Sequence, residues 1–227
     1  TKILFWNLSF FGFNEVVKLD VDGFLSNSRK VASLIRKVKP TEFVMLAADV
    51  QVFKRVSSVP AYKHDVAYLG MYHRSKSKEV AELVIHESAQ FDLAIYGSGW
   101  DENQILKPFW KGKLPTADIP SLYSSAKVVL GTTEDRQRKA GMINNRVFEA
   151  LACGARFISE HSVELEEVFG DSIYYSRNAG DTSAHIKQIL VNNGRAEQRI
   201  MKGVKLILEK HTYDYRVSQI LDFYRTL

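Results

Sequence analysis

Short runs of apolar, often β-branched residues recur along this chain, and a segment with helical periodicity follows each of them. Strands are expected at 66–69, 93–96, 128–130, 157–158 and 173–175. Strands that are buried on both faces read as continuous apolar runs, which is typical of a parallel sheet covered by helices. The fold class is therefore α/β, and five such units make one complete Rossmann-like, doubly wound domain.

Helices are expected between these strands, and the beginning of the chain has a different pattern. The helices are predicted at 76–90, 119–126, 144–153, 162–169 and 182–193, with a last stretch from 195 that is broken near 211–213. The first 60 residues predict a strand at 2–6, a helix at 28–37 and a strand at 43–47. The residues before Pro60 contain a serine pair and show no clear apolar period, which is typical of a connector. We therefore divide the chain into a partial second Rossmann-like domain with its linker (1–60) and a C-terminal domain (61–227).

Composition narrows the class of protein. The 227 residues are 45% apolar, which is enough for a packed core, and no apolar run reaches the roughly 18 residues that span a bilayer. The chain has one cysteine, Cys153, and no histidine pair with zinc spacing, so we expect no metal site. A lone cysteine also fits a reducing compartment, so we expect a cytoplasmic protein. The formal charge of +5 favours anionic partners mildly. The chain begins with Thr1 rather than methionine, and we expect residues to precede it.

Glycines and cations follow the strands where a doubly wound sheet binds its ligands. Gly70 precedes a cation, Arg74, just before a helix, which suits a phosphate group. Gly97 and Gly99 allow close backbone approach, and Trp100 offers a flat surface to a base or sugar. A glycine that only ends a strand and a tryptophan that belongs to the core are equally good interpretations.

The helix predicted at 144–153 carries the strongest local signal. At 100° per residue, Ile143, Val147 and Leu151 form its buried stripe, whereas Glu149 lies on another face. A carboxylate there can accept two hydroxyl hydrogen bonds, as from a ribose, and the helix N-terminus favours an anion. The alternative is a solvated helix glutamate. Before this helix, Leu114 and Tyr123 lie where a base edge can meet backbone groups.

The run NRVFEALACGA at 145–155 resembles the hallmark of the CgeB-like group of glycosyltransferases. The similarity extends to DVAYLG at 65–70 with Arg74, to LAIYGSGW at 93–100, and to LYSSAKVVL at 122–130. His211-Thr212-Tyr213 followed by Arg216 is similar to the C-terminal helix of that group. The motifs occur in the order of the family and cover residues 64 to 225.

The resemblance implies a GT-B enzyme, in which two Rossmann-like domains face each other and the C-terminal one holds a nucleoside diphosphate sugar. The sugar nucleotide is then a substrate, and neither a cofactor nor a metal is needed. Glu149 would bind the ribose, Arg74 and the amides around Asn144 the diphosphate, and the 97–100 and Leu114 regions the base. The donor-site residues expected in this way are Gly70, Arg74, Gly97, Gly99, Trp100, Leu114, Tyr123, Asn144, Asn145, Arg146 and Glu149.

Some features depart from the family or leave alternatives. Gly141 stands where many retaining relatives carry a second glutamate, so the sugar, the stereochemical outcome and the catalytic residue stay open. The acceptor stays open between polysaccharide, lipid-linked glycan, protein and nucleic acid. One alternative is an epimerase or hydrolase that uses Glu160 or His161, and another is a nucleotide-binding module without transferase activity. We interpret the Asp20-Val21-Asp22 triplet, which resembles a metal-binding motif, as chance.

Overall fold

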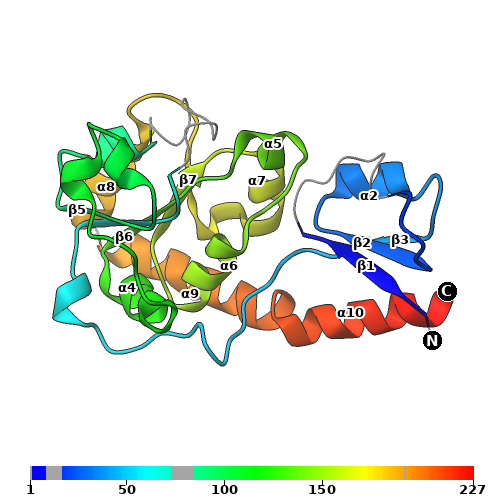
Figure 1. The fold of residues 1–227 in the computed structure, drawn as a ribbon. Helices are drawn as coiled ribbons and strands as arrows, with labels where there is room; N and C mark the ends of the chain where they lie inside the picture. Colours follow the sequence, from blue (N-terminus) through cyan, green and yellow to red (C-terminus); the bar gives the residue numbers. More distant parts are fainter. Residues whose placement is uncertain (1, 9–16, 73–83, 192) are drawn as a thin grey trace.

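The computed structural model describes residues 2–8, 17–72, 84–191 and 193–227, which form two parallel β-sheets (Figure 1). The larger sheet contains β4 (Val66–Leu69), β5 (Leu93–Tyr96), β6 (Val128–Gly131), β7 (Phe157–Glu160) and β8 (Tyr174–Ser176), in the order β5-β4-β6-β7-β8. The smaller sheet contains β1 (Leu4–Asn7), β2 (Gly23–Ser26) and β3 (Thr41–Phe43), in that order. This architecture confirms the predicted α/β class.

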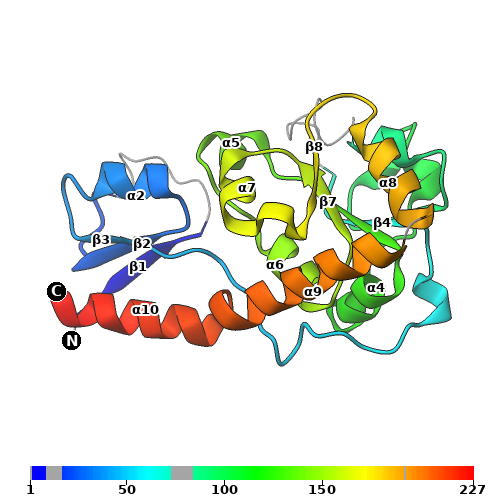
Figure 2. The same ribbon diagram turned by 180° about the vertical axis from the view of Figure 1, so that it is seen from behind.

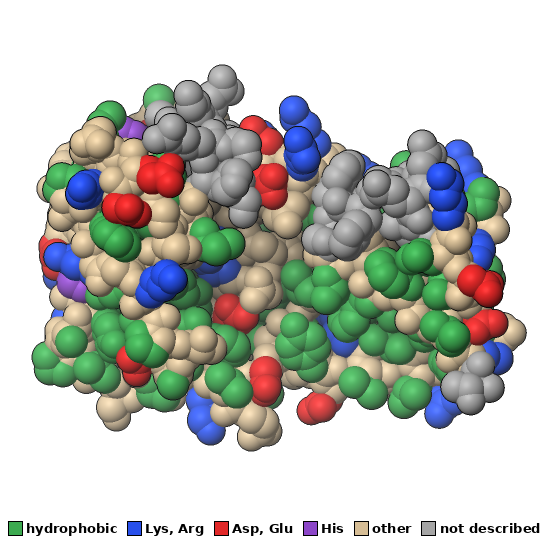
Figure 3. Space-filling view, viewed as in Figure 1, with side chains coloured by type: hydrophobic (Ala, Val, Ile, Leu, Met, Phe, Trp, Pro, Cys, Tyr) green, Lys and Arg blue, Asp and Glu red, His purple; other side chains and the backbone are tan. Residues whose placement is uncertain are grey.

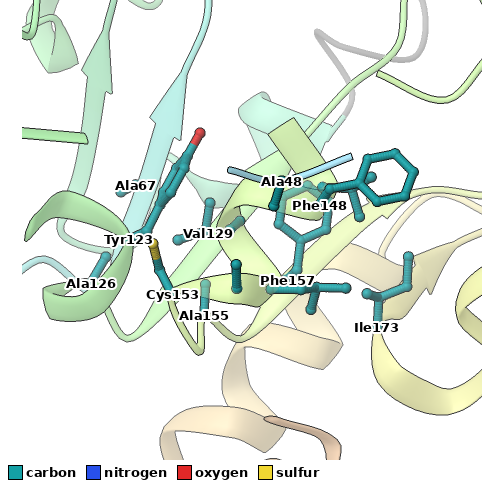
Figure 4. Packing of buried hydrophobic residues seen from close by; sticks show 14 of the residues in the cluster. Ala48, Ala67, Tyr123, Ala126, Val129, Phe148, Cys153, Ala155, Phe157 and Ile173 are labelled. Carbon is teal, nitrogen blue, oxygen red and sulfur yellow. The ribbon is translucent and has the colours of Figure 1, made fainter. Parts of the chain in front are cut away.

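Helices bury both faces of the larger sheet. On one face, strand residues such as Ala67, Val129 and Phe157 pack against α4 (Ile119–Ser125), α6 (Asn145–Ala152) and α7 (Val163–Phe169) (Figure 4). On the other face, Val66 and Val128 pack with the helical residues 84–88 and with α8 (Asp181–Val191). Because successive side chains of a strand point to opposite faces, two covered faces favour apolar residues at successive strand positions.

The smaller sheet lies between two helices from distant parts of the chain. One is α2 (Arg29–Ile35), which the Ser28 side chain caps by accepting a hydrogen bond from the Val31 amide. The other is α10 (Tyr213–Thr226), which runs along the opposite side of the sheet (Figure 2). The Gln219 side chain of α10 donates to the Phe43 carbonyl at 2.9 Å. The end of the chain is thus part of the unit that its beginning forms, and the division at residue 60 stays a prediction.

The predicted elements match the structure unevenly. The strands at 66–69 and 93–96 coincide with β4 and β5, and the break near 211–213 is confirmed, since α9 (Asn193–Lys210) ends just before it. The strand predicted at 43–47 is wrong, because β3 already ends at Phe43. The prediction missed β2 and α5 (Asp135–Lys139). Of the helix predicted at 76–90, residues 76–83 lie outside the described residues.

Arg216 bonds both to the linker, the segment that follows β3, and to the break between α9 and α10. Its side chain is 2% exposed, and its guanidinium donates to the carbonyls of Met45, Leu46 and Lys210. It also donates to Nδ1 of His211 at 2.7 Å. A parallel bridge between Ala48 and Thr212 closes the same junction. Because the cation buried on α10 is satisfied by acceptors from two other segments, 45–46 and 210–211, these three parts of the chain hold one mutual arrangement.

Replacing Arg216 by alanine should destabilise the protein by about 3 kcal/mol or more, because several buried carbonyls and the His211 acceptor lose their donor. The free energy of unfolding from urea titrations measures this loss. The control is Arg225→Ala, whose side chain is 72% exposed in an ion pair with Asp222, and which should change stability by less than about 0.5 kcal/mol. Equal losses in the two variants would contradict the proposed importance of the junction.

The same junction predicts a pH dependence. Burial, together with the charges of Arg216 and Lys210, lowers the pKa of His211 from 6.5 to about 4. Between these values the unfolded chain takes up a proton that the folded protein excludes, so stability should decrease by up to about 3 kcal/mol as the pH falls from about 6.5 to about 4. His211→Asn keeps an acceptor for Arg216 but does not titrate. Urea titrations across this range should give a shallower slope for the variant, and parallel slopes would exclude His211 as the cause.

Candidate functional site

The larger sheet reverses its direction of winding between β4 and β6. From β4 the chain crosses to β5 on one side, and it then returns to the other side of β4 to form β6. The carboxyl ends of β4 and β6 therefore flank the crevice where doubly wound sheets bind ligands. Three side chains meet there around Thr132, the residue after β6. Tyr68 hydrogen-bonds its Oγ1 at 2.9 Å, while Asn144 and Arg146 donate to its carbonyl at 3.0 and 3.2 Å.

The N-terminus of α6 opens into this crevice. The Asn144 side chain accepts a hydrogen bond from the Arg146 amide at 3.1 Å and so caps the helix. Asn144 is fixed in turn by its bonds to Thr132 and Thr133. The guanidinium of Arg146 lies 5.6 Å from the centre of the Tyr68 ring. A helix N-terminus and a half-buried cation thus face one point, which is an arrangement that binds anions.

Glu149 lies one turn further along α6 and is partly buried. Burial raises the pKa of its carboxyl group, and the Asn145 amide, which donates to Oε1 at 2.6 Å, opposes that shift together with the Arg146 charge. Glu149 is also close enough to Tyr213 to raise the pKa of that tyrosine. The Glu149 carboxylate therefore lies near Tyr213, the first residue of α10.

The glycines after β4 and β5 bring two loops against each other. The Gly70 amide donates to the Tyr96 carbonyl and the Tyr72 amide to the Ser98 carbonyl, both at 2.9 Å. A Cβ at Gly97 would lie 2.0 Å from the Gly70 oxygen, and one at Gly99 would lie 2.6 Å from the Tyr72 oxygen. Contact between loops therefore accounts for both glycines.

Trp100 belongs to the core that these loops cover. It is 3% exposed, its indole donates to the Gly70 carbonyl at 2.7 Å, and its ring packs edge-on against Tyr68. The core interpretation of Trp100 therefore holds in this structure, and its function is to support the loop after β4. The sequence left open whether the Trp100 ring stacks on a base or sugar, and in this structure the ring is buried in the core.

Tyr123 and Leu114 lie in the core on the opposite face of the sheet from Trp100. The Tyr123 ring is 1% exposed, and its hydroxyl has no hydrogen-bond partner among the residues that the structure describes. It lies near Arg146 and Glu149, and Figure 4 shows the Cys153 sulfur beside it. Burial raises the pKa of the Cys153 thiol to about 12, which fits a packed side chain rather than a nucleophile.

The two sheets meet next to this site. The Ser28 hydroxyl at the start of α2 donates to the Ala140 carbonyl, and Lys30 pairs with Glu164 of α7 at 2.8 Å. Gly141 has a positive φ of 71°, and a Cβ there would lie 2.6 Å from Oε1 of Glu164. The Glu164 carboxylate of α7 thus lies beside position 141. In the space-filling view the surface is hollowed between the two units (Figure 3).

The residues considered for other chemistry already have partners. Glu160 is 2% exposed and accepts hydrogen bonds from the Thr133 amide and the Ser159 hydroxyl. His161 pairs with Glu166 at 2.8 Å. Asp22 of the metal-like triplet accepts from the Ile3 amide. No cluster of three or more histidine, cysteine or acidic residues in the described ranges has metal-binding geometry.

Three of the expected donor residues, Asn144, Asn145 and Arg146, therefore come together with Glu149 on α6. Gly70, Gly97, Gly99 and Trp100 form one packed group beside them, and Arg74 lies outside the described residues. Sequence reasoning missed Tyr68 and Thr132. A tyrosine in an otherwise apolar strand just before Gly70 was a possible signal, but the importance of Thr132 follows only from the strand order.

Comparison with known proteins agrees with this fold. Two facing parallel α/β units define a GT-B glycosyltransferase fold, and solved structures of that fold match nearly the whole chain. Residues 74–222 match the family described as glycosyl transferase-like, and the chain belongs to that family. A search of curated proteins finds no match.

Three solved structures illustrate the likeness. Sucrose-phosphate synthase from Thermosynechococcus elongatus has a TM-score of 0.73 at 14% identity, covering 98% of this chain and 67% of that one. Anabaena HepE in complex with UDP and glucose has a TM-score of 0.70 at 12% identity, covering 95% and 67%. The pneumococcal O-GlcNAc transferase GtfA with UDP and GlcNAc has a TM-score of 0.60 at 14% identity, covering 94% and 46%. Within the described residues, no helix is long and apolar enough to cross a membrane.

Gly97→Ala should destabilise the protein more than Gly112→Ala. Both glycines have a positive φ, 130° and 90°, but only a Cβ at Gly97 would collide with backbone, whereas nothing lies within 4 Å of one at Gly112. We expect a difference of about 1–3 kcal/mol in the free energy of unfolding, from overpacking between the two loops. Urea titrations of both variants measure it. Similar losses would mean that the contact with Gly70 is not what requires glycine at position 97.

Proposed function

We propose that this chain is the donor-binding part of a CgeB-like glycosyltransferase, which moves a sugar from a nucleoside diphosphate sugar to an acceptor without a bound metal. The observation that carries the proposal is the convergence of the α6 N-terminus, Arg146 and Glu149 at the switch point between β4 and β6. The lone buried Cys153 fits a cytoplasmic protein.

The proposed positions of the donor follow from charge. The diphosphate binds at the start of α6, where the helix dipole and the Arg146 guanidinium supply positive charge. The ribose hydroxyls donate to Glu149, whose carboxylate the Asn145 amide keeps oriented. The base lies toward the loop after β5 and Leu114. Arg74 lies outside the described residues, and its expected contact with the diphosphate stays a prediction.

The same groups favour the reaction. Transfer breaks the bond between the anomeric carbon and a diphosphate oxygen, so negative charge develops on the leaving diphosphate. A fixed helix N-terminus and a cation stabilise that charge without reorganising, which is the contribution that a metal makes in other transferases. The carboxylate of Glu164, beside Gly141, lies where the two sheets meet, so we propose it as the acidic group nearest the transferred sugar.

Glu149→Ala should weaken nucleotide binding by roughly 1 to 3 kcal/mol, because the ribose hydroxyls lose a charged acceptor. The melting temperature of the unliganded protein should change little, since the side-chain carboxylate of Glu149 bonds only to the exposed Asn145 among the described residues. Calorimetric titration with UDP measures the affinity. Glu209→Gln, which changes an exposed carboxylate of α9, is the control and should bind as tightly as the original protein. Unchanged affinity in a folded Glu149→Ala protein would remove Glu149 from the site.

A thermal-shift screen tests the donor and the metal independence together. UDP, GDP, ADP, CMP and dTDP are compared with and without magnesium or manganese. We expect UDP to raise the melting temperature most, since structures with this fold hold UDP, and we expect the same shift in either metal condition. A shift that requires the metal would contradict the proposed mechanism. Binding without sugar transfer in an assay with UDP-sugars would favour the nucleotide-binding module instead.

A further inference from the structure

A cavity lies beside the break between α9 and α10, and Glu149 does not line it. It has a volume of about 510 Å³, which is within the range of roughly 300–1,000 Å³ for small-molecule pockets. Its walls come from α2, from β3 at the free edge of the smaller sheet, and from the break between α9 and α10. It therefore touches both units of the protein and is separate from the crevice between β4 and β6.

The charge of this cavity is strongly unbalanced. Four cations and one carboxylate line it: Arg29, Arg36, Lys210, Arg216 and Glu42. His211, which also lines it, is neutral at physiological pH because its pKa is about 4. Glu42 approaches Arg36 only to 3.8 Å, so even this pair is loose.

Two of the cations are available to a ligand. Arg29 stacks at 4.4 Å over the Phe43 ring, and its guanidinium donates to no acceptor in the described residues. Lys210 likewise has no carboxylate partner for its ammonium group there, although its carbonyl accepts from Arg216. Arg29 belongs to α2 and Lys210 to the end of α9, so an anion that contacts both crosses from one unit to the other.

The floor of the cavity is fixed. Arg216 is buried and donates to three carbonyls and to His211, so its guanidinium adds positive potential to the cavity while its position stays fixed. Gln219 is held by its bond to the Phe43 carbonyl at 2.9 Å. A rigid basic floor with two free cations at its rim suits a compact polyanion better than a single carboxylate.

We propose that this junction pocket binds a small phosphorylated molecule that carries two or more negative charges. The pocket is distinct from the donor site and does not depend on it. A bound ligand joins α2 to the α9–α10 break and so stabilises one arrangement of the two units.

Calorimetric titration of the full chain with inorganic pyrophosphate at low ionic strength, with UDP already bound at the proposed donor site, tests the proposal. The double variant Arg29→Ala/Lys210→Ala should bind pyrophosphate at least about tenfold more weakly than the original protein, because two charged donors are lost. The exchange Arg29→Lys/Lys210→Arg keeps both charges and should retain binding. Lys205→Ala, which removes an exposed cation of α9 outside the pocket, should bind like the original protein.

Parallel titrations with UDP separate this site from the donor site. The double variant should keep its UDP affinity, and Glu149→Ala should lose UDP affinity while it keeps the pyrophosphate site. The proposal is overturned if the original protein gives no pyrophosphate binding, if the double variant binds within twofold of it, or if Lys205→Ala weakens binding equally. A failure of UDP binding alone would count against the donor site and leave the junction pocket standing.

Discussion

The buried guanidinium of Arg216 is the interaction on which the arrangement of the two units depends. A charge that is almost removed from water must find dipoles in every donor direction, and here they come from the linker, from the end of α9 and from His211. Their carbonyls can point at Arg216 only when α10 leaves α9 in one direction. That direction carries α10 under the smaller sheet, where Gln219 holds β3. One side chain thus connects the last helix to the first sheet.

The same interaction explains why part of the fold was predictable and part was not. Strands β4 and β5 followed from their apolar runs, because burial on two faces favours apolar residues at successive positions. The apolar run at 43–47 obeys the same rule, yet β3 ends at Phe43, because the carbonyls of Met45 and Leu46 bond to Arg216 instead of a neighbouring strand. No local pattern contains that partner. Helix α5 was missed because its sequence, DRQRK, has no apolar period.

The candidate site divides along similar lines. Glu149 and the α6 N-terminus were predictable, since helical periodicity places the carboxylate off the buried stripe and capping chemistry marks the start. Gly97 and Trp100 were ambiguous, because a glycine that admits a phosphate and one that admits a neighbouring loop look alike in sequence. Only the parallel pairing of β4 with β5 shows that the Gly70 carbonyl occupies the space beside Gly97. Thr132 has no local signal, because its importance depends on which strand lies beside β6.

The donor site and the junction pocket depend on the same break in the chain. Glu149 lies close enough to Tyr213 to affect its pKa, while Lys210 and His211, just before Tyr213, line the pocket on the other side. Ligands at the two places are coupled only if they favour different arrangements of this break. Since Arg216 lies on α10 and bonds to Lys210 and His211, a change in the direction of α10 relative to α9 must break these hydrogen bonds. Both sites therefore lie beside the one break whose direction the hydrogen bonds of Arg216 fix.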